Sequence, residues 1–463
     1  MDDEAAVLTL GQQWFGAAEL GDVRRTRRLV KLADDILRHP GGTLPDKINS
    51  PANLKAMYRL MNREQVTHAA VIAGPCAVTR KKMAAAEGPV LIVHDATELD
   101  YSGLHSIPTL GQLGKGNHRG YIAHNVLAVK AETREVIGLA YQHLVKRAQP
   151  KKDETREQRR DRGDRESRWW KDASEHVPPA PQGKRYVEIG DRGSDVLEFI
   201  DYLEATGKQY TLRSKHNRKI QLENGDKTKL HDFARQLPEG GRRTVSVPAS
   251  EGRTARTAVV AVSWACVKLL IPQQPRGEVR GEPLTAWVVC LREIAPPAGV
   301  EPLEWILLTN VPVNSFVDAC ERIDWYHTRW IIEEYHKGMK TGCQIEDMQF
   351  TTEAGLRPAI ALLSVVAVSL LQLRDISRRP DAQTLPATEI FSPRLVESLS
   401  VWRYQQRRTN LTVHEFCFAL ARLGGHQNRK CDRQPGWLVL WRGWTKLQMM
   451  EQYASALAEA RCG

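Results

Sequence analysis

The chain has 463 residues, 42% of them hydrophobic and 26% charged, which allows two or three domains with sizeable cores and argues against a wholly disordered or membrane-embedded protein. Lysine and arginine outnumber aspartate and glutamate by 66 to 55, a formal net charge of +11. This excess favours polyanionic partners, although many soluble proteins that bind no nucleic acid also carry one.

The eight cysteines form no CxxC pair and no cluster with histidine at zinc-ligand spacing, so we expect free thiols and a cytoplasmic location. The acidic N-terminus, with Asp2, Asp3 and Glu4, does not resemble a secretory signal. The longest apolar segment, Ala359 to Leu373, is too short to cross a bilayer and is predicted to be a buried helix, so no membrane partner is expected.

Residues 1–72 are predicted to form a small helical domain. The segment from Leu20 to Leu37 is its clearest helix, with Asp22 as the N-cap. Its apolar residues recur at helical spacing: Leu29, Leu32 and Ile36. Its other face carries four arginines: Arg24, Arg25, Arg27 and Arg28.

A second basic segment runs from Ser50 to Arg63. Two such helices favour contacts with phosphates and a nucleic-acid groove, with a merely solvated face as the alternative.

A sheet is predicted after residue 88. The run from Pro89 to Asp95 is continuously apolar and ends in an acid, which indicates a buried strand with a carboxylate at its C-terminal end. Two strands around a polar turn are predicted between His124 and Val145. A further strand ends at Asp191, where glycines on both sides allow a close turn, and a helix is expected from Val196 to Ala205.

The segment from Lys146 to Lys171 is almost devoid of aliphatic residues and is predicted to be a mobile surface loop. Trp169 and Trp170 near its end suggest either packing or stacking on bases. Residues from about 207 to 311 hold short strand-like runs between turns, which predicts a mainly antiparallel insertion. After a proline-containing linker the tail is predicted to be helical. The domains are therefore expected at 1–72, 73–376 and 377–463.

One helix is predicted from Tyr326 to Lys340. At helical spacing its polar residues share one stripe: Tyr326, Arg329, Glu333 and Lys340. The opposite face is apolar and is expected to dock onto a core: Ile331, Ile332, Tyr335 and Met339. A carboxylate flanked by cations and a phenol suits a site that grips a metal-bound phosphodiester. A surface ion pair between Arg329 and Glu333 is the alternative.

Three acids stand out: Asp95, Asp191 and Glu333. A strand-terminal aspartate is usually a turn or cap residue. If the first and fourth strands are neighbours, however, a helix packed across them brings the three carboxylates together. Hard oxygen donors of this kind suit Mg²⁺ or Mn²⁺, and two such ions roughly 4 Å apart can promote in-line displacement at phosphorus without a covalent protein nucleophile.

The four residues of the polar stripe match the Y-x2-R-x3-E-x6-K (YREK) signature of bacterial cut-and-paste DDE transposases, and IIEEYHKGMKTG around them resembles the transposon-five branch of that family. Further agreeing segments occur in the same order along most of the chain: LGDVRRTRRLV, VHDAT, GDRGSD, LRSKHNRK, WILLTN, SVVAVSLLQLR and ARLGG with spaced tryptophans. Each is weak singly, but their shared order argues against a chance match.

The resemblance implies an α/β fold in which an RNase H-like mixed-sheet core, interrupted by a β-rich insertion, lies between a helical N-terminal DNA-binding domain and a helical C-terminal dimerisation domain. It implies that Asp95, Asp191 and Glu333 are the catalytic triad and bind two Mg²⁺ ions per active site, with Mn²⁺ as a substitute.

The resemblance also implies how DNA is held. Tyr326, Arg329 and Lys340 would hold the 5′ phosphate of the non-transferred strand. Trp305 would stack on a flipped base, with packing in the core as its competing role. The remaining expected DNA contacts lie in the insertion and the N-terminal helices: Arg213, Lys215, Arg24, Arg25 and Arg28.

The sequence thus predicts a transposase that binds terminal inverted repeats, pairs them as a homodimer, excises the element through a hairpin intermediate and joins the 3′-OH ends to target DNA. Its expected location is the bacterial cytoplasm, at the nucleoid when bound to DNA. A stand-alone RNase H-like nuclease and a non-catalytic end-binding inhibitor remain as alternatives. The relative has Arg-Glu-Ala-Asp where Arg-Gly-Ser-Asp follows Asp191 here, a difference that leaves the metal site intact. The N-terminal helices match more in general character than in identity, so recognition of a particular end sequence is not predicted.

Overall fold

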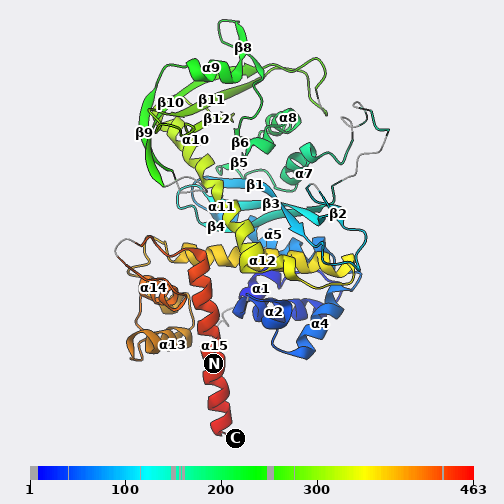
Figure 1. The fold of residues 1–463 in the computed structure, drawn as a ribbon, viewed down its shortest axis with the longest axis vertical. Helices are drawn as coiled ribbons and strands as arrows, with labels where there is room; N and C mark the ends of the chain where they lie inside the picture. Colours follow the sequence, from blue (N-terminus) through cyan, green and yellow to red (C-terminus); the bar gives the residue numbers. More distant parts are fainter. Residues whose placement is uncertain are drawn as a thin grey trace.

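The protein, in a computed structural model, is described at residues 9–39, 41–114, 116–147, 153–155, 158, 162–247, 255–275, 277–429 and 432–462. Its described strands form one twelve-stranded mixed sheet. Helices cover both faces of the sheet, and a further layer of N-terminal and C-terminal helices lies beneath it (Figure 1).

The first half of the sheet joins an antiparallel hairpin to two parallel strands. Its strands are β1 (Val90–Asp100), β2 (Gly111–Gln112), β3 (Arg119–Lys130), β4 (Val136–Val145), β5 (Tyr186–Gly190) and β6 (Gln209–Arg213). β1 pairs antiparallel with β3 and parallel with β5, β3 pairs with β4, and β5 is parallel to β6. The hairpin predicted between residues 124 and 145 is confirmed, and the first and fourth predicted strands are indeed neighbours.

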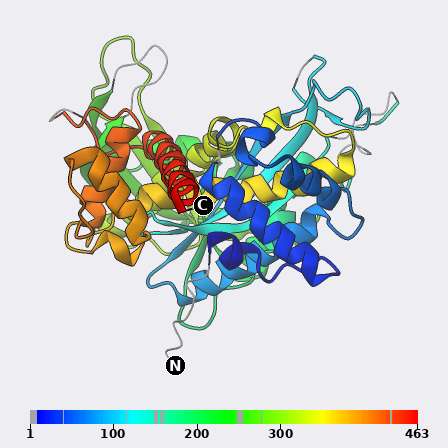
Figure 2. The same cartoon turned by 90° about the horizontal axis from the view of Figure 1, so that it is seen from below.

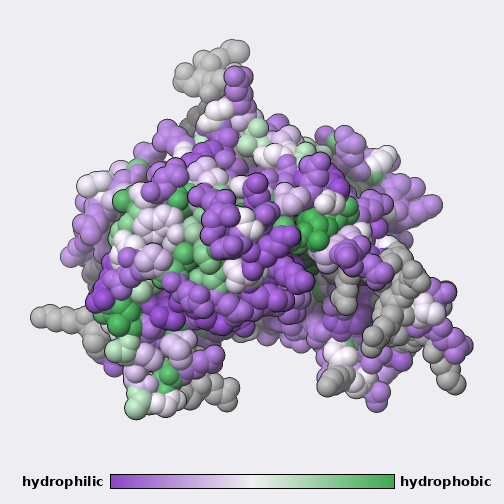
Figure 3. Space-filling view, turned by 90° about the horizontal axis from the view of Figure 1, so that it is seen from above, coloured by the Kyte–Doolittle hydropathy of each residue, from purple (hydrophilic) through white to green (hydrophobic). Residues whose placement is uncertain are grey.

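The second half of the sheet is antiparallel and continues from the first. Its strands are β7 (Lys219–Gln221), β8 (Lys227–Lys229), β9 (Gly241–Val247), β10 (Arg256–Leu269), β11 (Leu284–Glu293) and β12 (Glu304–Thr309). β12 pairs with β6, so the expected insertion does not form a separate sheet, and its first predicted strand belongs to the parallel half. The region also contains α9 (Leu230–Gln236). The surface of this end, seen from above, is largely hydrophilic with scattered hydrophobic areas (Figure 3).

The two helices predicted in the N-terminal region are present as its second and fourth helices, and its last helix crosses the predicted domain boundary at residue 72. The N-terminal helices are α1 (Leu10–Phe15), α2 (Val23–Arg38), α3 (Leu44–Lys47), α4 (Pro51–Met61) and α5 (His68–Ala85). Asp22 caps α2 by accepting from the amide of Arg24, and Ser50 caps α4. Leu29, Leu32 and Ile36 are fully buried, which confirms the apolar face of α2.

The long apolar segment is a core helix. α12 (Glu353–Ile376) begins at the N-cap Thr352 and packs against α4, α5, α15 and β4. It is long and apolar enough to cross a membrane, but 89% of its most apolar window is buried inside the protein. The buried helix predicted at 359–373 is therefore confirmed.

The tryptophan pair at the end of the charged segment is packed inside. α7 (Trp169–Glu175) and α8 (Leu197–Ala205) cover the face of the sheet opposite α12. Trp169 and Trp170 are 8% and 7% exposed, so the packing alternative is confirmed. The charged segment lies partly outside the described residues.

The predicted helix from Tyr326 to Lys340 is interrupted. It consists of α10 (Phe316–Thr328), α11 (Trp330–Lys337) and a π turn at Gly338–Gly342, with the break at Arg329. A Cβ on Gly342 would lie 2.6 Å from Leu370 Cδ1, so glycine lets this turn approach α12 closely. Periodicity could not reveal the break because Arg329 keeps helical backbone angles.

The tail is helical, as predicted, and packs on the N-terminal helices. It contains α13 (Pro393–Tyr404), α14 (Val413–Leu423) and α15 (Trp437–Cys462). α15 lies between α13 and α14 on one side and the N-terminal helices on the other (Figure 2). Trp444 Nε1 donates to the carbonyl of Leu37 at 3.0 Å. The C-terminal half of α15 extends beyond the other elements (Figure 1).

Candidate active site

Strand register places Asp95 and Asp191 at the same level of the sheet. Val93 is the partner of Ile189 in the parallel pair β1–β5, and each aspartate follows two residues later. Because side chains alternate along a strand, both aspartates share the face of Val93 and Ile189. Asp95 does not end its strand, as the sequence had suggested, because β3 continues to pair with β1 as far as Asp100.

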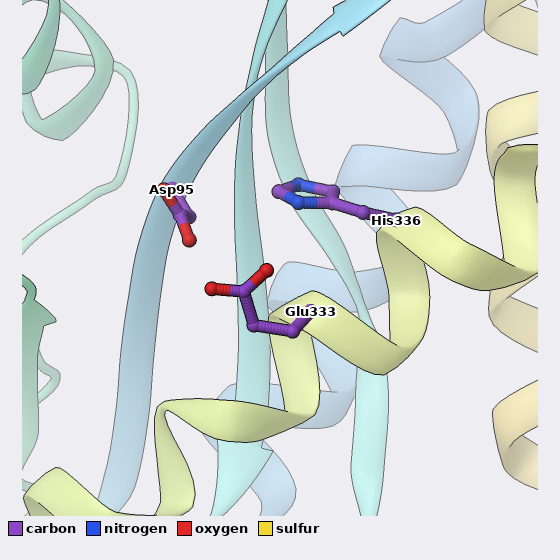
Figure 4. A group of neighbouring side chains, drawn as sticks. All are labelled: Asp95, Glu333 and His336. Carbon is purple, nitrogen blue, oxygen red and sulfur yellow. The ribbon is translucent and has the colours of Figure 1, made fainter. Parts of the chain in front are cut away.

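Glu333 reaches this face from α11. The helix docks through the predicted apolar residues Ile331, Ile332 and Tyr335, and Met339 in the following π turn is also buried. This leaves Glu333 facing β1, where its carboxylate, the carboxylate of Asp95 and a ring nitrogen of His336 lie within 4.8 Å of one another. Figure 4 shows the three side chains pointing toward one another from β1 and α11.

Arg329 bridges the two carboxylates. Its Nη1 lies 3.1 Å from Asp95 Oδ2 and 3.3 Å from Glu333 Oε1. Its side chain is only 13% exposed. The ion pair with Glu333 is therefore present, but it is not only a surface pair, because the Arg329 side chain is mostly buried and also pairs with Asp95 on β1.

Asp95 is poised to prefer a cation. Burial, with a smaller contribution from the neighbouring charges of Asp191 and Glu333, raises the pKa of its carboxyl to about 7 against the opposing effect of Arg329. A divalent cation would relieve this repulsion, and the clustered carboxylate oxygens are donors that Mg²⁺ and Mn²⁺ accept. The residues present therefore fit a divalent metal ion.

Asp191 stands slightly apart. It caps the short 3₁₀ turn at Arg192–Ser194, where its Oδ1 accepts from the amide of Gly193 at 2.7 Å. Its charge acts on Asp95, yet among the described residues the group with all ligand atoms within 4.8 Å does not include it. The structure thus brings two of the three predicted acids into one cluster and holds the third nearby.

His336 was not predicted from the sequence. It follows Glu333 by three residues, a helical spacing that places both on one face and that could have drawn attention to it. Burial lowers the pKa of its imidazole to about 3, and the charges of Lys340 and Arg329 act in the same direction. The ring is therefore neutral.

Tyr326 and Lys340, the other two members of the polar stripe, lie in different surroundings. Tyr326 is 4% exposed, and its ring packs edge-on against Trp305 of β12 with 5.0 Å between ring centroids. Lys340 lies in the π turn, with Nζ 3.2 Å from Glu346 Oε1. The stripe is therefore continuous only from Arg329 to Glu333, and Trp305 is partly buried beside it.

The predicted contacts in the insertion lie close to the turn of Asp191. Arg213 donates to the carbonyl of Glu304 at 3.0 Å. Lys215 is exposed, while its amide donates to Asp195 Oδ2 at 2.6 Å. Asp195 therefore fixes the loop after β6 onto the segment that also carries Asp191.

The arginines of α2 differ in exposure. The side chain of Arg24 is 85% exposed beside Asp22. Arg25 donates to the carbonyl of Leu20, and Arg28 donates to Asn53 Oδ1 at 3.1 Å, so both also brace the helix.

Carboxylates gathered on one face of a mixed sheet and on the helix across it suit a metal-dependent enzyme of the α/β class. Comparison with known families gives two matches: residues 11–66 match the model for a transposase DNA-binding domain, and residues 88–369 match the model for a transposase DDE domain. The second match spans more than half of the chain, and the chain therefore belongs to the DDE transposase family. It is a DDE-type, metal-dependent transposase with an N-terminal DNA-binding region.

Proposed function

We propose that this transposase binds the terminal inverted repeats of its own element, excises the element and joins the freed 3′-OH ends to target DNA. The observation that carries this is the Asp95–Glu333 pair, bridged by Arg329, with Asp191 at the end of the adjoining parallel strand. The matched families support binding and catalysis on one chain.

The catalytic core is RNase H-like. The strand order β4-β3-β1-β5-β6, with three antiparallel strands followed by two parallel ones, supports this fold, as does the placement of one acid within β1 and another just after β5. The antiparallel strands β7 to β12 are its β-rich insertion.

Asp95, Asp191 and Glu333 are the residues that would hold two Mg²⁺ ions, or Mn²⁺ in their place. Such ions supply charge stabilisation and a more acidic attacking water when bound. The chain itself supplies the converging carboxylates and the guanidinium of Arg329, which lies beside them and would hold an anionic phosphate oxygen there.

Excision proceeds by strand cleavage, hairpin formation and hairpin opening, followed by attack of the 3′-OH on target DNA. The YREK residues Tyr326, Arg329 and Lys340 hold the 5′ phosphate, and Trp305 stacks on a base flipped to relieve the bend of the hairpin. The contact between Trp305 and Tyr326 supports a shared role. Because Tyr326 is buried and Lys340 is paired with Glu346, both must be released when DNA binds.

DNA outside the active site is held by the N-terminal helices and the loop after β6. Arg24, Arg25 and Arg28 lie within the matched DNA-binding region, and Arg24 is the most exposed of the three. The exposed Lys215, with Arg213 beside it, is tied to the turn of Asp191 and thus is placed to position DNA relative to the carboxylates. The protein acts in the bacterial cytoplasm, at the nucleoid when DNA is bound.

The ends are paired by a homodimer formed through α15. This helix extends from the body and exposes apolar residues one turn apart, at spacing i, i+4 and i+8: Met449, Tyr453 and Leu457. Such a stripe on a projecting helix suits packing against a second copy.

Glu333→Ala tests this proposal. We expect cleavage of cognate ends in Mg²⁺ to be lost while end binding in gel-shift assays stays within about twofold, because the variant removes a ligand and leaves the DNA-binding helices intact. Retained cleavage would remove Glu333 from the triad. A strand-transfer assay separates the alternatives, since a stand-alone nuclease gives no joined products and an inhibitor gives no metal-dependent nick.

A further inference from the structure

A buried chain of hydrogen bonds runs along one face of the sheet, the face covered by α5, α11 and α12, and ends at His336. Its members come from four elements: His68 on α5, Gln142 on β4, Asn125 on β3 and His336 on α11. His68 Nε2 lies 3.0 Å from Gln142 Oε1, and Gln142 Nε2 donates to Asn125 Oδ1 at 2.7 Å. Asn125 Nδ2 then lies 3.1 Å from His336 Nε2. All four side chains are less than a tenth exposed.

The direction of this chain is fixed by a backbone carbonyl. Asn125 Nδ2 also donates to the carbonyl of Ala123 at 3.1 Å, and a carbonyl oxygen can only accept. Turning the amide over would set two oxygens against each other and leave buried donors unpaired, which is unfavourable. Asn125 therefore donates to His336 Nε2.

This hydrogen bond decides which nitrogen of the imidazole carries the proton. Since Nε2 accepts, the single proton of the ring is at Nδ1, and a protonated nitrogen cannot bind a cation. Building on the proposed metal-dependent function, we propose that His336 is a positioning residue that donates its Nδ1–H to an oxygen within the Asp95–Glu333 site, and that it is not a metal ligand. The site then keeps oxygen-only coordination, which suits Mg²⁺.

Binding of Mn²⁺ alone to the full chain tests this assignment. Pulsed electron paramagnetic resonance is expected to show no coupling of bound Mn²⁺ to a histidine ¹⁴N. His336→Ala is expected to weaken Mn²⁺ binding about 10–100-fold, as loss of a group that orients a ligand does. His336→Gln keeps an N–H donor and is expected to recover most of the affinity. His118→Ala, at an exposed histidine paired with Asp100, is the control and is expected to bind as wild type.

Two results would overturn the assignment. A ¹⁴N coupling in the wild type that disappears in His336→Gln would make His336 a ligand. Unchanged Mn²⁺ affinity in a folded His336→Ala variant would make it a bystander.

Asn125→Asp tests the hydrogen-bond chain separately. A carboxylate at this position accepts from Nε2–H, which moves the ring proton and frees the lone pair of Nδ1. A ¹⁴N coupling is then expected to appear, and to be absent from Asn125→Asp/His336→Gln. No coupling in Mn²⁺-loaded Asn125→Asp would show that Asn125 does not set the tautomer. None of these measurements needs DNA, so a failed transposition assay would count against the proposed function and not against this role of His336.

Discussion

Asp95 shows that the site holds negative charges close together at a cost in stability. Its carboxyl is buried next to two other acids, and Arg329 compensates only in part, so its pKa rises from 3.8 to about 7. As pH rises, the unfolded chain loses this proton before the folded protein does. The metal-free fold therefore loses stability between about pH 4 and pH 7, and the loss remains complete above that range.

Asp95→Asn is expected to raise the free energy of unfolding of the metal-free protein by roughly 2–4 kcal/mol at pH 8, because one pKa unit corresponds to about 1.4 kcal/mol. The gain should shrink as pH falls and vanish near pH 4. Urea unfolding in EDTA across this range measures it. Asp226→Asn, at an exposed turn, controls for loss of one negative charge. A gain that does not change with pH would contradict the explanation.

At the scale of single elements, the turn after β5 decides where Asp191 points. A Cβ on Gly190 would lie 2.3 Å from Ser194 Oγ and 2.5 Å from Ser194 Cβ. The turn therefore closes tightly only because residue 190 has no side chain, and the close turn expected from the sequence has a steric reason.

Gly190→Ala is expected to displace this turn, lower stability by about 1–3 kcal/mol and reduce nicking at least tenfold. Adding Ser194→Gly removes the clash and should restore most of the nicking. Gly103→Ala is the control, because nothing lies within 4 Å of its Cβ position. If the double variant nicks no better than Gly190→Ala, the clash is not the cause.

The projecting end of α15 carries the proposed dimer contact. Tyr453 is 68% exposed at the centre of the apolar stripe. Tyr453→Glu is expected to shift the protein or its complex with paired ends to a single copy in analytical ultracentrifugation, because a charge would be buried in an apolar contact. Ala454→Glu places the same charge on an adjacent face and should leave assembly intact. Equal sedimentation of the two variants would argue against this interface.

At the scale of the whole molecule, net charge and the matched DNA-binding region both point to phosphate contacts. The N-terminal helices, the sheet and α15 pack into one body. Trp444 of α15 donates a hydrogen bond to a backbone carbonyl of α2, and α12 contacts the N-terminal helices, β4 and α15. The exposed face of α2 therefore lies at a fixed distance from the carboxylates.

End binding is expected to weaken steeply with salt, by roughly one log unit of affinity per log unit of salt for each phosphate neutralised. Fluorescence anisotropy between 50 and 300 mM KCl, concentrations of about this order, measures the slope. Arg24→Ala should lower the slope by about one, since its side chain is 85% exposed. An unchanged slope would mean that Arg24 contacts no phosphate.

The sequence determined the elements and much of the chemistry. Helix caps such as Asp22, the apolar faces of α2 and α11, and the longer strands of the sheet follow from periodicity and capping, which depend on neighbours within a few residues. The i, i+4 spacing of Arg329 and Glu333 likewise predicted their ion pair, which the structure contains although the helix is interrupted at Arg329. The short strands β2, β7 and β8 were not predicted.

Only the tertiary structure decided which groups meet. The register of β1 against β5 set the level of Asp191 relative to Asp95. Strand β6, which the sequence had assigned to the antiparallel insertion, pairs in parallel with β5. Packing buried Tyr326 against Trp305. The backbone carbonyl of Ala123 in β3 fixed the orientation of the Asn125 side-chain amide, which faces His336. These outcomes depend on contacts between residues far apart in the chain, whose pairing leaves no local periodicity in the sequence.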